Sequence, residues 1–177
     1  MSVRIIAGQW RSRQLEVPEA LGLRPTPNRV RETLFNWLMD DVVGAHCLDA
    51  FAGSGALGFE ALSRGADHVT FIDSNPQVIK HLRATGDLLK TTQASYLLGS
   101  FPEKIKLSEQ FDIVFLDPPF HQGLIEPSLQ FLVQSNLLKP RALIYVEQEI
   151  NAEHAHSNLA CLKSKTTGQV SYSLWKA

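Results

Sequence analysis

Residues 111–120 of the chain are Phe111-Asp112-Ile113-Val114-Phe115-Leu116-Asp117-Pro118-Pro119-Phe120. The part from Phe111 to Leu116 is almost continuously apolar and β-prone, which is typical of a strand buried on both faces of a parallel sheet. Asp117 then introduces a carboxylate, and the two prolines after it hold φ at about −65° and donate no backbone hydrogen bond. Ligands of open α/β sheets bind outside the carboxyl ends of the strands. We therefore predict an α/β fold with a ligand site at this corner.

The corner from Asp117 to Phe120 suits the exocyclic amino group of a nucleobase. Such an amine is a poor nucleophile, because its lone pair is delocalised into the ring. Asp117 and the carbonyl of Pro118 can accept both amino hydrogens and hold the nitrogen pyramidal, and Pro118 and Pro119 fix these acceptors in advance. Phe120 can stack on the base, an interaction worth about 1–3 kcal/mol. The alternative for this motif alone is a tight turn with Phe120 in the core.

A glycine-containing turn follows the predicted strand 45–49 and leads into a predicted helix at 56–64. Gly53 and Gly55 let the backbone pass close to a ligand, and Asp73, after the next strand, is placed to accept hydrogen bonds from ribose hydroxyls. The turn lacks the first glycine of the dinucleotide fingerprint and the lysine of a P-loop. An adenosine ligand without a phosphate fits better, and the alternative is again a tight turn.

The other elements follow from apolar periodicity and capping patterns. Thr26 is predicted to cap a helix that has Pro27 in its first position and ends near residue 39, and Asn75 to cap another that begins at Pro76. Residues 90–100 give a weak signal. The remaining predicted elements are a hairpin of strands 3–7 and 14–17, a strand at 69–72, a helix at 127–134, a strand at 143–147, and an antiparallel closing pair at 159–163 and 169–175.

Length and composition indicate one globular domain. The chain has 177 residues, 44% hydrophobic and 20% charged, and no apolar run approaches the ~20 residues needed to cross a membrane. Cys47 and Cys161 are too few and too isolated for a disulfide framework or a zinc site. We expect a cytoplasmic, monomeric protein with no membrane partner and no metal, divided into an extension (residues 1–44) and a catalytic core (residues 45–177).

Positive charge is concentrated at the amino terminus. Residues 1–31 contain six arginines, two glutamates and no lysine, a net charge of +4 in a chain whose total is −1. A basic arm on an acidic body suits a phosphate-bearing partner, and arginine makes bidentate phosphate contacts and stacks on bases. The alternative is a solvated arginine-rich hairpin. The predicted RNA-binding residues are Arg4, Arg11, Arg13, Arg24, Thr26, Arg29 and Arg31.

The glycine turn, Asp73 and the Asp117 corner occur in order at the ends of three successive predicted strands. Together they resemble the class I S-adenosylmethionine-dependent methyltransferases that methylate exocyclic amines. The resemblance to one family, the RsmD family, covers nearly the whole chain. The segments that carry it are Arg4–Arg13, Leu23–Leu38, Leu48–Gly58 and Phe111–Phe120.

This resemblance implies a bacterial enzyme that methylates N2 of a guanine in 16S rRNA, guanine 966 in the family's usual naming, within an assembling or assembled small ribosomal subunit. It implies a Rossmann-like sheet of seven strands with a reversed last strand, flanked by helices, and the cofactor S-adenosylmethionine. The implied catalytic residues are Asp117, Pro118, Pro119 and Phe120. The implied cofactor-binding residues are Asp49, Phe51, Gly53, Ser54, Gly55, Asp73, Ser74 and Asn75.

The chain departs from the family pattern mildly at Pro27 and Asn28 and more clearly at two other places. The acidic residue expected near the adenine, after the third strand, is absent around Gln93-Ala94-Ser95, and a usual glycine pair is replaced by Arg141-Ala142. Other hypotheses stay open at this point: a DNA adenine or cytosine amino-methyltransferase, a methyltransferase acting on small molecules or on protein glutamine, and a catalytically idle cofactor-binding scaffold on the ribosome. A DNA enzyme usually needs a target-recognition domain, for which 177 residues leave no room.

Overall fold

A mixed sheet forms the centre of the protein. The computed structural model describes residues 1–19, 22–23, 25–150 and 159–177, and within them seven strands pair in the order β5-β4-β3-β6-β7-β9-β8. The first five run parallel, and β9 runs antiparallel to its neighbours β7 and β8. These strands are β3 (His46–Asp49), β4 (His68–Asp73), β5 (Ala94–Leu98), β6 (Phe111–Leu116), β7 (Leu138–Glu149), β8 (Ala160–Thr167) and β9 (Val170–Lys176). The predicted seven-stranded sheet with a reversed last strand is confirmed.

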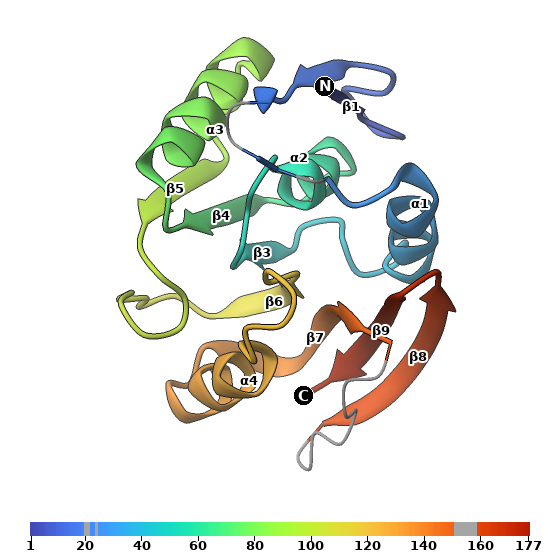
Figure 1. Cartoon of the computed structure of the whole chain (residues 1–177), viewed down its shortest axis with the longest axis vertical. Coiled ribbons are helices and arrows are strands. Elements are labelled where there is room, and N and C mark those ends of the chain that lie inside the picture. The colour runs from blue at the N-terminus through green and yellow to red at the C-terminus, as the bar shows by residue number, and fades with distance from the viewer. Residues whose placement is uncertain (20–21, 24, 151–158) are drawn as a thin grey trace.

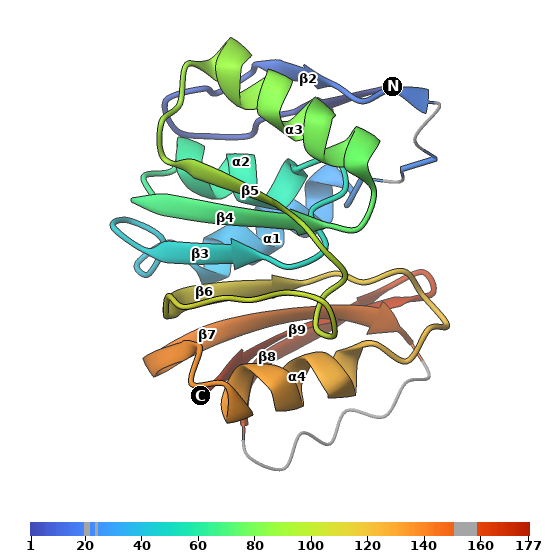
Figure 2. The same ribbon diagram turned by 90° about the vertical axis from the view of Figure 1, so that its left-hand side faces the viewer.

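Helices cover both faces of this sheet, and a hairpin lies at one end (Figures 1 and 2). Side chains of α1, α2, α3 and the hairpin share one apolar cluster with one face of the sheet, and α4 packs in a second cluster on the other face. The bounds are α1 (Asn28–Trp37), α2 (Ala56–Ser63), α3 (Pro76–Leu89), α4 (Ile125–Gln134), β1 (Ser2–Arg4) and β2 (Gln14–Glu16). No helix in these described ranges is long and apolar enough to span a bilayer.

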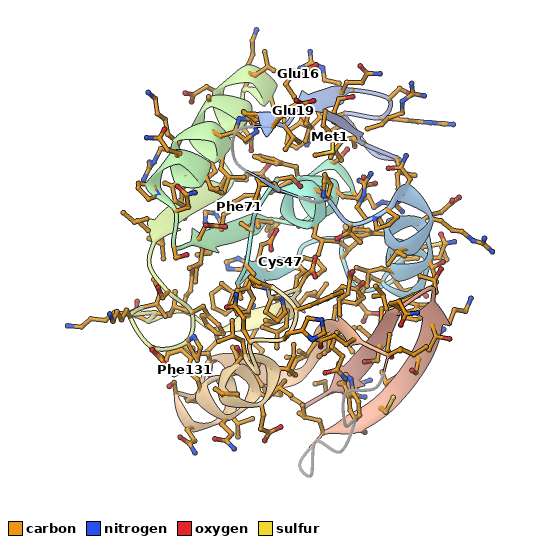
Figure 3. The ribbon with its side chains drawn as sticks, viewed as in Figure 1. Met1, Glu16, Glu19, Cys47, Phe71 and Phe131 are labelled. Carbon is orange, nitrogen blue, oxygen red and sulfur yellow. The ribbon has the colours of Figure 1, made fainter. Side chains whose placement is uncertain are left out.

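The two clusters follow from the alternation of side chains along the strands. Cys47 and Phe71 are fully buried in the first cluster, and the Phe71 ring lies 4.7 Å from that of Phe59 on α2. Phe131 belongs to α4 and packs against the second cluster. Figure 3 shows Cys47 and Phe71 in the interior of the molecule and Phe131 at the lower left, on α4.

Local patterns placed most elements correctly. The Asn75 side chain accepts the Gln77 N–H at 2.9 Å and Pro76 opens α3, as predicted. Residues 94–98 form β5 despite their weak signal, because they pair with β4 along its length at the edge of the sheet. In β7, Arg141 adopts φ of 67°, a conformation in which glycine has no steric cost. A glycine, which the resemblance leads us to expect at this position, would therefore fit the backbone without strain.

The predicted cap of α1 is wrong. The helix begins at Asn28, Pro27 occupies the capping position, and no side chain caps the helix. The Thr26 hydroxyl instead donates to Oδ2 of Asp117 at 3.0 Å, across 91 positions of sequence. A threonine before a proline suits either role, and here the distant carboxylate holds the hydroxyl.

Candidate active site

Four carboxylates lie at the carboxyl ends of four adjacent parallel strands. Leu116 on β6 pairs with Val146 on β7, so that the next residues, an aspartate and a glutamate, are cross-strand neighbours. Because side chains alternate along a strand, the four acids share the face that buries the first apolar cluster. They are Asp73 on β4, Asp49 on β3, Asp117 after β6 and Glu147 on β7.

The four acids line one cavity of about 680 Å³. Its floor is the edge of the sheet, and its walls come from four segments distant in sequence. These segments are the chain before α1 (Pro25–Pro27), the turn after β3 (residues 50–54), the segment after β5 (residues 99–103) and the corner after β6 (residues 117–120). All residues predicted to be catalytic are therefore at the cavity, together with Thr26 from the amino-terminal extension.

On the β3–β4 side, backbone amides hold the carboxylates. Asp49 is buried and its Oδ2 accepts the Gly58 N–H at 3.0 Å. Asp73 accepts the Gly53 N–H at 3.0 Å and the Asn75 N–H at 2.9 Å, one on each oxygen. Burial raises the pKa of Asp49 to about 7, although the Gly58 hydrogen bond opposes the shift. The positions of these acceptors are set by the fold itself.

The two glycines of the turn have different roles. Gly53 lines the cavity with φ of 51°, so it brings the backbone close to any ligand there. Gly55 is buried, has φ of 77° and does not line the cavity. A Cβ at Gly55 would lie 2.7 Å from side-chain atoms of Phe59 and Leu82. A glycine is therefore needed at position 55 for helix packing, and its contact with a cofactor stays a prediction.

The other predicted cofactor-binding residues line the cavity. They are Asp49, Phe51, Gly53, Ser54, Asp73, Ser74 and Asn75. The sequence missed the wall that follows β5. Residues 93–95, where an acid was sought, lie at the amino end of that strand, whereas Ser100, Phe101 and Glu103 beyond its carboxyl end line the cavity. The Phe101 ring meets Phe51 edge to face at 5.9 Å, which gives this part of the cavity an apolar wall.

On the β6–β7 side, side-chain hydroxyls hold the carboxylates. Asp117 Oδ2 accepts the Thr26 hydroxyl, and Glu147 Oε2 accepts the Tyr145 hydroxyl at 2.8 Å. Burial, and then the charge of Glu147, hold the pKa of Asp117 well above its usual range, while the Thr26 hydrogen bond lowers it. Pro118 is buried, and the Phe120 ring is 36% exposed. An aromatic face is therefore available to a ligand at the cavity.

Glu147 is not among the site residues predicted from the sequence, and the structure places it in the cavity. A signal for it was present. The four acids all stand two positions after a buried residue of the same apolar cluster, namely Cys47, Phe71, Phe115 and Tyr145. An acid in this register at the carboxyl end of a central strand points to the same edge as the other three.

Most of the predicted RNA-binding arginines are exposed. Among the described residues, no ion pair is formed by Arg11, Arg13 or Arg29, whose side chains are exposed. Arg4 is exposed at the end of β1. Arg24 lies outside the described residues. The basic arm is thus a surface feature over most of its predicted positions.

The predicted RNA contact of Arg31 is wrong, because its side chain is buried. It is 0% exposed, its Nη1 lies 3.3 Å from Glu60 Oε2, and its Nη2 donates to the Arg4 carbonyl at 2.9 Å. Glu60 also accepts the backbone N–H groups of residues 6 and 7. Arg31 therefore ties the extension to α2 and cannot reach RNA. It forms an i, i+3, i+4, i+7 series with Leu34, Phe35 and Leu38, the pattern of a buried helix face.

Comparison with known proteins places this site in a family. The family model described as "Conserved hypothetical protein 95" matches residues 3–176. The chain is 49% identical over 180 residues to Ribosomal RNA small subunit methyltransferase D of Haemophilus influenzae, covering 98% of this chain and 93% of that protein. The protein of the same name from Escherichia coli K12 is 44% identical over 177 residues, covering 98% and 89%.

A solved structure shows the same architecture. The Escherichia coli protein yhhF, provisionally named a methyltransferase, superposes with a TM-score of 0.90 at 41% identity and covers 99% of this chain and 98% of that one. The agreement thus includes the amino-terminal extension, the glycine turn and the corner at Asp117. The chain belongs to the RsmD family and has the Rossmann-like fold of class I methyltransferases.

Proposed function

We propose that this protein transfers a methyl group from S-adenosylmethionine to the exocyclic N2 of a guanine in 16S rRNA, at the position usually named 966. The observation that supports it most is the Asp117–Phe120 corner, which lines one cavity together with Asp49, Asp73 and the glycine turn. Relatives at 44–49% identity are named as small-subunit rRNA methyltransferases. An amine-binding corner beside a nucleoside-binding turn is what that reaction requires.

The β3–β4 side fits the cofactor. Asp73 is suited to the ribose hydroxyls, because both its oxygens are already oriented by backbone amides. Gly53 admits the backbone close to the ligand, and the Phe51–Phe101 pair offers an apolar wall for a purine. S-adenosylmethionine supplies an electrophilic methyl group on a sulfonium, so the protein has mainly to align and polarise the amine.

The β6–β7 side fits the base. Asp117 and the carbonyl of Pro118 accept the two amino hydrogens, which directs the nitrogen lone pair towards the methyl group. Phe120 stacks on the base. Pro118 and Pro119 hold the acceptors in place, so little reorganisation is needed during the reaction. Asp117 need not be a strong base, because the methylated ammonium is acidic and loses its proton readily.

The exposed arginines of the extension fit an RNA backbone. Arg11, Arg13 and Arg29 are free of ion pairs among the described residues, and the extension reaches the cavity through Thr26. Changing Arg11 and Arg13 together to Ala should weaken binding to 16S rRNA and reduce the slope of log affinity against log salt by about 1 for each phosphate that an arginine no longer neutralises. An unchanged slope would remove this arm from the RNA site.

The reaction is tested by transfer of a tritiated methyl group to undermodified 16S rRNA, naked and in assembled small subunits, followed by nucleoside analysis. We expect label in N2-methylguanosine from at least one of the two substrates. Label in N6-methyladenosine or N4-methylcytosine, preferential labelling of DNA, or no transfer to either substrate would contradict the proposal. The two RNA substrates also identify the assembly state on which the protein acts.

A further inference from the structure

Glu147 has a position that the reaction above does not use. It lies near the end of β7, is 5% exposed and lines the same cavity as Asp117. The register of β6 and β7 makes the two residues cross-strand neighbours, because each follows a residue of the Leu116–Val146 pair. On its other side Glu147 pairs with Tyr172 of β9. The carboxylate thus projects from a strand that is paired on both edges.

A hydrogen bond from Tyr145 fixes the orientation of the Glu147 carboxylate. Tyr145, two residues earlier on the same face, is fully buried and donates its hydroxyl to Glu147 Oε2 at 2.8 Å. Burial, followed by the charges of Glu147 and Asp117, holds the pKa of Tyr145 well above its usual range. The tyrosine therefore stays protonated and remains a hydrogen-bond donor to Glu147.

Asp117 and Glu147 are neighbouring carboxylates in one cavity, and burial and the like charge of Glu147 both oppose ionisation of Asp117. A ligand that offers several adjacent N–H donors would relieve this cost. Guanine presents N1–H directly beside its 2-amino group, giving three hydrogens along one edge. Adenine instead has a lone pair at N1, which a carboxylate would repel.

We propose that Glu147 accepts the N1–H of the target guanine and thereby selects guanine among purines. The inference rests on the proposed N2 methylation. In this arrangement Asp117 and the Pro118 carbonyl hold the amine that reacts, and Glu147 reads the adjacent ring nitrogen. Their positions on neighbouring strands match the adjacency of N1 and N2 on the base. Tyr145 is a positioning residue that acts through Glu147.

The test replaces the target guanine in an RNA substrate with 2,6-diaminopurine, which keeps the 2-amino group but has a lone pair at N1. The ratio of kcat/KM for the two substrates is measured for the wild-type protein and for Glu147→Gln. Glutamine has the same size and can donate its amide to that lone pair. The Glu109→Gln variant, with a carboxylate before the amino end of β6, controls for the loss of one negative charge.

We expect the wild-type protein to prefer guanine by at least about a hundredfold, since sites that bond a substrate N–H discriminate strongly against analogues without it. Glu147→Gln should narrow this preference by about tenfold or more, the effect of one hydrogen bond to a charged group. Glu109→Gln should leave the ratio unchanged. Thermal unfolding and cofactor affinity of Glu147→Gln show whether the variant is folded.

Two results would overturn the inference. One is a wild-type protein that methylates both substrates equally well, a measurement that does not depend on any variant folding. The other is a Glu147→Gln protein that is slower on both substrates with the same ratio, as expected of a purely structural residue. Failure of the proposed function is seen separately, because the wild-type protein would then form no N2-methylguanosine on the unmodified guanine substrate.

Discussion

The two sides of the cavity hold their carboxylates by different means. On the β3–β4 side, Asp49 and Asp73 accept backbone N–H groups from the turn after β3, from the first turn of α2 and from the capping residue of α3. On the β6–β7 side, Asp117 and Glu147 accept the hydroxyls of a threonine and a tyrosine. Backbone donors are fixed by the fold, and the buried Tyr145 hydroxyl is held by its packing, whereas the Thr26 hydroxyl can rotate away and leave Asp117 to another donor.

This difference matches the two ligands that we propose. A cofactor that is the same in every cycle suits acceptors that the fold orients permanently. A base that must enter from a large RNA suits acceptors whose partners in the free protein can be exchanged for substrate N–H groups. The Thr26 hydroxyl is the clearest example, since it comes from the extension and donates to the carboxylate that we propose for the amine.

The largest effect is expected from Asp117→Ala. The variant loses the acceptor that orients the amine, and loss of one such preorganised interaction costs about a hundred- to a thousandfold in kcat. Cofactor affinity should change by less than about twofold, because the β3–β4 side is untouched. Steady-state methyl transfer and calorimetric titration of S-adenosylmethionine measure the two quantities. Near wild-type turnover with intact cofactor binding would show that Asp117 is not part of the reaction.

Asp73→Ala should have the opposite effect, a loss of cofactor affinity with little change in kcat. Removing this carboxylate deletes the proposed ribose acceptor and releases the N–H groups of Gly53 and Asn75. We expect cofactor affinity to fall by about ten- to a hundredfold, equivalent to about one or two hydrogen bonds. The kcat value at saturating cofactor should stay within a few-fold of wild type. The matched control is Asp67→Ala, which removes an exposed aspartate before β4. If Asp73→Ala lowered kcat and left cofactor affinity unchanged, the assignment of the β3–β4 side to the cofactor would be contradicted.

The same division explains what the sequence could predict. On the β3–β4 side, Gly53 and Asp73 belong to local motifs at strand ends, so their positions at the cavity could be predicted from the sequence pattern. On the β6–β7 side, the corner at Asp117 was also local, but its partner Thr26 is 91 positions away. A short polar side chain before a proline looks like a helix cap, and no local pattern reports a tertiary hydrogen bond.

Buried charge was the other limit. Arg31 was grouped with the surface arginines because composition alone does not distinguish a solvated guanidinium from one paired with Glu60 in the interior. The closing antiparallel pair and the capped start of α3 were accessible from hydrophobic runs and caps. The seven-stranded sheet with its reversed last strand was implied by the family resemblance, and the order of its strands comes from the structure. The edge strand β5 gave a weak signal, because its residues are only partly buried and its apolar pattern is therefore weak. Its strand conformation is stabilised by pairing with β4, which the local sequence does not report.

The pH dependence of kcat/KM for RNA, measured at saturating cofactor, should follow the ionisation of Asp117 on the β6–β7 side. Asp117 must be ionised to accept the amine hydrogens, and its pKa in the free protein lies well above the usual range. The kcat/KM value for RNA should therefore rise as pH increases through this raised pKa and then level off. Stability has the opposite sign: this carboxyl favours folding below its unfolded pKa, and the contribution is lost as pH rises through the folded pKa. Asp117→Asn should abolish the rise in activity, and a rise that persists in the variant assigns it to another group.

The smallest effect is expected from Thr26→Val, which keeps the shape of the side chain and removes its hydroxyl. That hydroxyl stabilises the ionised form of Asp117 and so lowers its pKa. Without it, the midpoint of the kcat/KM profile should move to higher pH by about 0.5–1 unit, the equivalent of one ordinary hydrogen bond. Cofactor affinity should be unchanged. A midpoint that moves to lower pH would mean that the hydroxyl stabilises the neutral carboxyl, and the exchange of Thr26 for the substrate amine would then lose its basis.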